Sequence, residues 1–316
     1  MSDTSDNVVG SVAAQPLVSV IIATRNRPGE LRAALDGLKT QKYANIEVIV
    51  VDQSATPAPL GPDYTFAVRF TAEPRGAAAA RNLGLKHARG EVIVCVDDDV
   101  IIDRGTFIAE HVTAYADPAV GAVCGRCIEP SNQSARERLP RIIQVLALTI
   151  GGVYRQTDGY ATNLKGANMS FRRDLLAAVG GFDERFGAPC MYEESDVAWK
   201  VRRLGFKIAY RAGAVLTHLG VPGGGQRTHK KNDCRYLAYR DRVLLFMNNM
   251  PRYVLPVFLL GNFILALRPL LRLDFASTSM GLSGLAMGVH RYIWRSKRSQ
   301  LRFSGQNAPI DRKPGE

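Results

Sequence analysis

Three consecutive aspartates interrupt an apolar run in the segment VIVCVDDDVII, residues 92–102. Three adjacent carboxylates repel one another and lose hydration when buried, so Asp97, Asp98 and Asp99 need a compensating positive charge. Side chains alternate along an extended segment, which points Asp97 and Asp99 to the same side. Two carboxylates at a strand end are typical ligands of Mg²⁺ or Mn²⁺. A solvated acidic turn, or helix capping before Thr106, accounts for the three residues equally well.

A second acidic group stands in YEESD, residues 192–196. Glu193, Glu194 and Asp196 fall at the start of an expected helix. A carboxylate within hydrogen-bond reach of a hydroxyl serves as a general base. The alternative is that these acids only complement the helix dipole.

His218 ends the apolar segment AVLTHLG. It is either a half-buried histidine or a further metal ligand. The glycine-rich, basic segment 220–231 follows it. This segment is either a flexible linker or a loop that closes over a diphosphate, with Arg227 pairing to phosphate.

Apolar runs alternate with helical patterns in the first part of the chain. We expect strands at 17–23, 46–52, 66–70 and 91–97, with helices near 31–38 and 77–88 between them. Such alternation predicts a doubly wound, mostly parallel sheet, whose ligands bind at the carboxyl ends of the strands. Polar residues follow three of these strands, at 24–26, 52–54 and 97–99.

The second part is less regular. We expect a helix at 139–150, a helix at 193–205 and two short strands between 205 and 218. The residues of the second helix expected to face inward are Val197, Val201 and Leu204.

The composition narrows the class of protein. The chain has 316 residues and a formal charge of +12. Its five cysteines are an odd, scattered set that does not resemble a disulfide framework, so we expect a reducing compartment. Residues 1–16 are expected to form a disordered leader without the apolar stretch of a signal peptide. A nucleic-acid-binding protein fits the charge, but Lys and Arg concentrate in the tail, beside aliphatic runs rather than stacking aromatics. We therefore expect no nucleic-acid partner.

Residues 233–316 read as helical, basic and aromatic. Their longest apolar run, 254–267, contains Pro256 and Asn262 and is shorter than the roughly 20 residues of a membrane-spanning helix. We expect an interfacial element on an anionic membrane surface. Packing on the core, or an oligomer contact through this region, is the alternative.

Five stretches in order resemble the inverting family 2 glycosyltransferases of the GT-A fold. They are VSVIIATRNRP, VIVVDQS, RGAAAARNLGLKHARGEVIVCVDDDV, GANMSFRRDLLAAVGGFDERFG and YEESDVAWKVRRLGF, and they cover roughly Leu17 to His218. A histidine at the position of His218 is similar to that of rhamnosyl- and galactofuranosyltransferase-like members, where it is a metal ligand.

The resemblance implies a role for each matching residue. Asp52 would bind the nucleotide base, Asp97 the ribose or the metal, and Asp99 with His218 the metal. Glu194, which stands where Asp is commoner, would be the catalytic base. Glu193 and Asp196 would support it or hold the acceptor. The full set of expected donor-binding residues is Thr24, Asn26, Asp52, Arg81, Asp97 and Asp98.

The predicted organisation is a leader (1–16), an α/β GT-A domain (17–232) and a membrane-associating helical region (233–316). The implied enzyme uses Mn²⁺ or Mg²⁺ to move a sugar from a nucleoside-diphosphate sugar to a glycan or lipid-linked acceptor. Its expected location is the cytoplasmic face of the plasma membrane. The alternative is a catalytically silent GT-A scaffold that binds partners or membrane.

Overall fold

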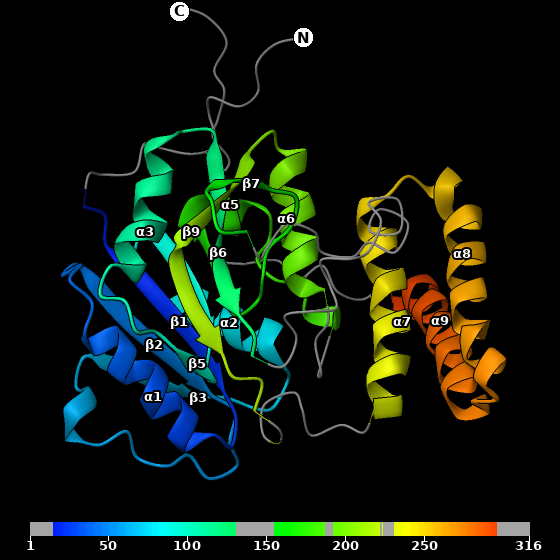
Figure 1. Ribbon diagram of the computed structural model, residues 1–316, viewed down its shortest axis with the longest axis horizontal. Helices are drawn as coiled ribbons and strands as arrows, with labels where there is room; N and C mark the ends of the chain where they lie inside the picture. The colour runs from blue at the N-terminus through cyan, green and yellow to red at the C-terminus, as the bar shows by residue number, and fades with distance from the viewer. Residues whose placement is uncertain (1–14, 131–154, 187–191, 222, 224–230, 296–316) are drawn as a thin grey trace, which may run out of the picture.

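A computed structural model describes residues 15–130, 155–186, 192–221, 223 and 231–295, and Figure 1 shows a sheet domain beside a layer of long helices. The strands are β1 (Val18–Thr24), β2 (Ile46–Asp52), β3 (Ala67–Thr71), β4 (Val92–Asp97), β5 (Val100–Ile101), β6 (Val120–Ile128), β7 (Gly159–Ala161), β8 (Asn168–Arg172) and β9 (Lys207–His218). The helices are α1 (Pro28–Lys39), α2 (Ala77–His87), α3 (Phe107–Thr113), α5 (Arg173–Ala178), α6 (Glu193–Arg203), α7 (Lys231–Asn249), α8 (Leu255–Leu267) and α9 (Phe275–Arg295). Short 3-10 turns lie at Pro62–Tyr64, Ala114–Ala116, Glu184–Phe186, Arg252–Val254 and Arg268–Arg272.

The strands form one mixed, mostly parallel sheet in the order β3-β2-β1-β4-β8-β6-β9-β5, with β7 paired to β9. Strands β1 to β4 are parallel to one another, and β8 runs antiparallel between β4 and β6. The register sets Thr24 beside Asp52 and Ala23 beside Asp97. The polar residues that follow these strands therefore meet at one edge of the sheet, as expected for an α/β ligand site.

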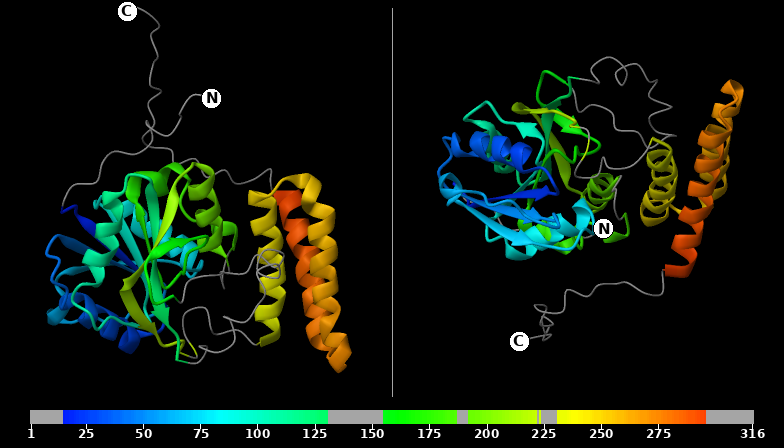
Figure 2. Two further views of the ribbon diagram at one scale, coloured as in Figure 1. Left: turned by 45° about the horizontal axis from the view of Figure 1, so that its top comes forward. Right: turned by 90° about the horizontal axis from the view of Figure 1, so that it is seen from below.

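Both faces of the sheet are buried, which explains why its strands are near-continuous apolar runs. Along β1, Ile21 packs with the core beneath α2, α5 and α6, and Val20 packs with the core beneath α1 and α3. Figure 2 shows helices on each side of the twisted sheet.

Two expectations about the second half were wrong. Residues 207–218 form one long strand rather than two short ones, and its pairing with β6 continues across a shift of register between Gly125 and Arg126. Leu204 is 44% exposed, because α6 ends at Arg203 and the helical face of Val197 and Val201 does not continue. The helix expected at 139–150, the leader up to residue 14 and Arg227 lie outside the described residues.

The helical layer attaches to the domain through α7. The Asp196 carboxylate, fully buried in α6, accepts hydrogen bonds from Asn248 (3.0 Å) and Asn249 (2.7 Å) of α7 and pairs with Lys200 (2.8 Å). Asp196 was predicted to support the base or hold the acceptor. These contacts anchor α7 to α6 through Asp196.

The apolar helical segment of the tail is longer in the structure than the apolar run identified in the sequence. The segment Arg252–Arg272 is the one helix among the described residues that is long and apolar enough to cross a membrane, with 17% of its most apolar window buried. Our sequence count stopped at the 14 residues between Val254 and Leu267. Pro256 lies in the first turn of α8, where proline is tolerated, and a 3-10 turn extends the helix past Arg268.

Candidate functional site

Strand pairing brings Asp97, Asp99 and His218 together. The two-residue strand β5, directly after the aspartates, pairs antiparallel with the end of β9, so Val100 lies opposite His218. The backbone N–H of Leu219 donates to the Asp99 carbonyl at 2.9 Å. One ligand atom from each of the three side chains lies within 4.8 Å of the others, and they could hold a metal ion.

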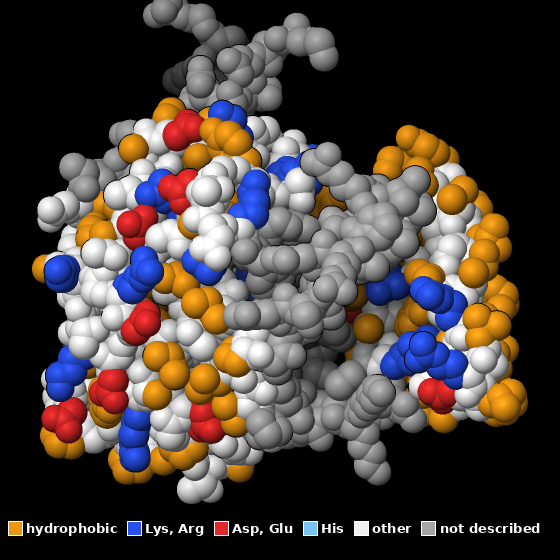
Figure 3. Space-filling view, in the orientation of Figure 1, with side chains coloured by type: hydrophobic (Ala, Val, Ile, Leu, Met, Phe, Trp, Pro, Cys, Tyr) orange, Lys and Arg blue, Asp and Glu red, His pale blue; other side chains and the backbone are white. Residues whose placement is uncertain are grey.

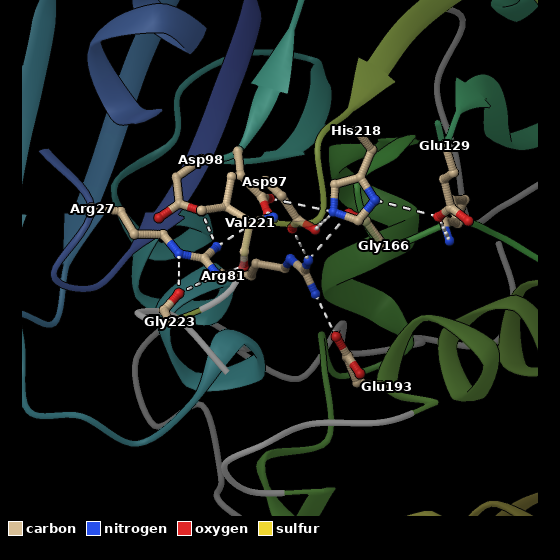
Figure 4. A network of polar contacts seen from close by, with 12 residues as sticks. Arg27, Arg81, Asp97, Asp98, Glu129, Gly166, Glu193, His218, Val221 and Gly223 are labelled. Atoms are coloured by element: carbon tan, nitrogen blue, oxygen red, sulfur yellow. Dashed lines mark hydrogen bonds and ion pairs between the residues drawn. The ribbon is translucent and has the colours of Figure 1, made fainter. Parts of the chain in front are cut away.

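The His218 ring lies between carboxylates (Figure 4). Its Nε2 is 3.3 Å from Asp99 and 3.8 Å from Asp97, and its Nδ1 is 3.3 Å from Glu129. Burial by itself lowers the pKa of His218, but the hydrogen bonds to Asp99 and Glu129 raise it to about 9. Glu129 was not among the site residues predicted from the sequence. It follows β6 directly, so recognition of 120–128 as a strand would have added it to the polar strand ends.

The middle aspartate points away from the other two. Asp98 was predicted among the donor-binding residues, together with Thr24. In the structure the two side chains are buried and in contact, and the Thr24 hydroxyl donates to Asp98 at 2.7 Å. Arg27 donates to the other Asp98 oxygen at 3.0 Å and lies 3.3 Å from Asp99. Burial raises the pKa of Asp98 to about 6, although Thr24 and Arg27 oppose the shift.

Arg27 is a second residue that sequence reasoning missed. Its guanidinium also donates to the backbone carbonyls of Val221 and Gly223, both at 3.0 Å or less, and the Val221 N–H donates to Asp99 at 3.1 Å. Arg27 therefore ties the start of the glycine-rich segment to Asp98 and Asp99 and supplies positive charge to these two carboxylates, while Arg81 pairs with Asp97.

The expected base pocket gathers at the ends of β1 and β2. Asp52 is buried, its carboxylate accepts the Ser54 N–H at 2.9 Å and lies 3.9 Å from Arg69. Asn26 has a left-handed backbone, with φ of 55°, and its N–H donates to the Ser54 hydroxyl at 2.7 Å. Asn26, Asp52 and Ser54 thus form one connected polar group.

Arg81 joins the acidic cluster to the second acid pair. This buried side chain of α2 donates to Glu193 at 2.6 Å, to Asp97 at 3.0 Å and to the Gly166 carbonyl at 3.1 Å. It was predicted to lie near the nucleotide. In the structure one guanidinium spans from the candidate metal ligands to the residue before Glu194, as Figure 4 shows.

Glu194 is half-buried next to Glu193. It lies in the first turn of α6, after Tyr192, whose φ of 72° marks a sharp change of direction. Burial raises the pKa of Glu194 well above the usual glutamate range, and repulsion by Glu193 adds to the shift. A carboxyl group whose pKa is raised by its site is a typical proton acceptor in catalysis.

A family model described as "Glycosyl transferase family 2" matches residues 19–180, just over half of the chain. The chain belongs to this family. The match includes β1 to β8 and the candidate metal ligands Asp97 and Asp99, and ends before α6 and β9. The contributions of Glu194 and His218 therefore rest on the geometry of the site.

Curated relatives agree with the family. The chain is 28% identical over 210 residues to the pre-mycofactocin glycosyltransferase of Mycobacterium tuberculosis, covering 64% of this chain and 42% of that protein. It is 23% identical over 202 residues to the poly-beta-1,6-N-acetyl-D-glucosamine synthase of Staphylococcus aureus, covering 61% and 47%. The chain thus spans less than half the length of these relatives.

Solved structures show the same GT-A fold. A mannosyltransferase from Pyrobaculum calidifontis, in complex with GDP-Man and Mn²⁺, aligns with a TM-score of 0.56 at 20% identity, covering 92% of this chain and 90% of that one. TarS residues 1–349 of S. aureus, in complex with UDP-GlcNAc, align with a TM-score of 0.55 at 14% identity, covering 87% and 91%.

The raised pKa of Glu194 predicts a pH dependence of activity. A base must be deprotonated, so kcat should fall as the pH drops through the pKa of Glu194, well above the usual glutamate range. Replacing Glu193 with Gln removes the neighbouring charge and should move this acid limb to lower pH, while turnover on the plateau persists. Steady-state pH profiles of both proteins test this. An unchanged limb in E193Q would show that another group titrates.

Proposed function

We propose that the protein is a metal-dependent, inverting glycosyltransferase that moves a sugar from a nucleoside-diphosphate sugar to a hydroxyl group of its acceptor. One observation carries the proposal: Arg81 links the Asp97–Asp99–His218 group to the acid pair Glu193–Glu194. Such a transfer needs a site that binds the phosphates of the donor next to a base that takes the proton of the acceptor hydroxyl.

The ligand atoms suit a hard divalent cation. The two carboxylates suit Mn²⁺ or Mg²⁺, and the mannosyltransferase in complex with GDP-Man also holds Mn²⁺. Asp97, Asp99 and His218 would hold the cation, which supplies positive charge to the leaving diphosphate. In this proposal Asp52 and Asn26 bind the nucleoside end of the donor.

Glu194 acts on the acceptor. It accepts the proton of the attacking hydroxyl on the side of the sugar opposite the leaving nucleoside diphosphate, so the configuration at the anomeric carbon inverts. Glu193 forms a 2.6 Å ion pair with Arg81, and its repulsion adds to the raised pKa of Glu194. We propose a glycan or a lipid-linked glycan as the acceptor.

Turnover separates this proposal from a catalytically silent scaffold. The purified protein is incubated with UDP-, GDP- and dTDP-sugars, Mn²⁺ and candidate glycan acceptors, and the released nucleoside diphosphate is measured. At least one donor should give release that stops with excess chelator. Binding without release under every condition would favour the scaffold.

We further propose that α8 lies in the surface of an anionic membrane. One face of α8 is buried against α7 and α9 through Phe258, Asn262 and Ala266. The other face exposes large apolar side chains, including Val257 (64%), Leu260 (61%) and Ile264 (56%). Figure 3 shows hydrophobic side chains along this edge of the molecule, with Lys and Arg beside them. An exposed apolar face with basic side chains beside it suits the headgroup boundary and would place the enzyme on the cytoplasmic face, near lipid-linked acceptors.

Charged substitutions on α8 should release the protein from membranes. The double variant L260E/I264E removes two apolar side chains worth about 1.5–3 kcal/mol each when buried, so liposome affinity should fall about a hundredfold or more. Flotation with anionic liposomes measures it. V68E, at a similarly exposed valine on β3 (57%), is the matched control and should float as wild type does. A wild-type protein that is soluble at low salt without detergent and does not float would assign the α8 face to an oligomer contact instead.

A further inference from the structure

Glu129 has a position that the proposed reaction has not yet used. It follows β6, which runs parallel to β9 with Ile128 paired to Thr217. The next residue on each strand is Glu129 and His218, so the register itself sets these two side chains next to each other. Both are buried, at 7% and 8% exposure, and the Glu129 carboxylate lies 3.3 Å from His218 Nδ1.

The contact decides which ring nitrogen faces the acidic cluster. A carboxylate only accepts hydrogen bonds, so Nδ1 must carry the proton that lies between the two groups. Lys165 forms an ion pair with Glu129 and keeps it in the carboxylate form. Metal binding at Nε2, the nitrogen that faces Asp97 and Asp99, would displace the proton on that nitrogen and leave the Nδ1 proton directed at Glu129. Carboxylates that orient a histidine in this way typically strengthen metal binding.

We propose that Glu129 is a positioning residue, which fixes the ring orientation and tautomer of His218 so that Nε2 is presented as a metal ligand. The inference rests on the metal site of the proposed function. Glu129 acts through His218 and touches neither the donor nor the acceptor. Lys165 belongs to the same arrangement, since it holds the carboxylate that holds the ring.

Metal affinity, measured without turnover, tests the inference. Mn²⁺ is titrated into the full-length protein, and free Mn²⁺ is followed by electron paramagnetic resonance. E129A should weaken binding about 10- to 100-fold. E129Q keeps an acceptor for the Nδ1 proton but has no charge. Its Mn²⁺ affinity should fall less than that of E129A, but by more than about threefold. E110Q is the matched control, because Glu110 also pairs with a β9 side chain, Arg211, at 2.9 Å, and its affinity should equal wild type.

A double-mutant cycle distinguishes positioning from a general structural role. Because Glu129 acts through His218, adding E129Q to H218A should cause no further loss of Mn²⁺ affinity, whereas independent contributions would add. Wild-type affinity in a folded E129A or E129Q protein, or full additivity in the cycle, overturns the inference. If E129A does not fold, E129Q and the cycle decide alone. A wild-type protein that binds no Mn²⁺ would instead refute the metal site of the proposed function.

Discussion

Replacing Glu194 with Gln lowers the rate of sugar transfer by about 10²- to 10⁴-fold, the usual contribution of a general base, and leaves donor affinity unchanged. Gln keeps the shape of the side chain and cannot accept the proton. Donor affinity is spared because the donor-binding residues proposed here lie at the ends of β1, β2 and β4, while Glu194 lies in the first turn of α6. Steady-state transfer and donor titration on the same preparation measure the two effects.

E193Q is the comparison for this variant. It changes the adjacent carboxylate, whose Oε1 pairs with Arg81 at 2.6 Å, and should shift the pH profile rather than abolish turnover. Turnover of E194Q within about tenfold of wild type is too small a loss for a general base and would move the role to Glu193. Asp196 is not a substitute, because Asn248 and Asn249 cover its carboxylate.

Replacing Asp99 with Asn, or removing divalent metal with a chelator, should reduce transfer about a hundredfold or more, since a bound cation contributes several kcal/mol of charge stabilisation. Adding Mn²⁺ or Mg²⁺ back should restore the transfer activity of the wild-type protein but not that of D99N. D103N is a suitable control, because Asp103 is exposed and lies outside the metal-ligand group.

Full activity in excess chelator would contradict the metal requirement. Activity that survives in H218A alone would remove only the histidine from the ligand set and leave Asp97 and Asp99. The two results are separable, because chelation acts on the whole site and H218A on one ligand.

The parallel strands and the strand ends that form the site were predictable from the sequence, because buried parallel strands give continuous apolar runs and end in polar residues. The alternation of side chains likewise placed Asp97 and Asp99 on one side, with Asp98 on the other. What Asp98 contacts was not predictable. Its partner Arg27 comes from a segment about seventy residues earlier, and no local pattern links the two.

Long-range pairing also set the rest of the site. Strand β5 has two residues, too few for a periodic signal, yet its pairing with β9 brings His218 to the aspartates. Glu129 and Arg81 reach their partners through the same kind of tertiary contact. The tail shows the opposite case: Pro256 and Arg268 read as interruptions in the sequence, but the helical geometry accommodates both.

Stabilisation by donor and metal together is the most direct measurement of the central claim. Ligands that bind the native state raise its melting temperature, so thermal unfolding is followed with UDP-, GDP- and dTDP-sugars, each with and without Mn²⁺. We expect at least one nucleotide sugar to raise the melting temperature of the wild-type protein in the presence of Mn²⁺, much less so without it, and not in D99N. A metal-independent shift of equal size in wild type and D99N, or no shift with any donor, would contradict a metal-dependent nucleotide-sugar site at Asp97, Asp99 and His218.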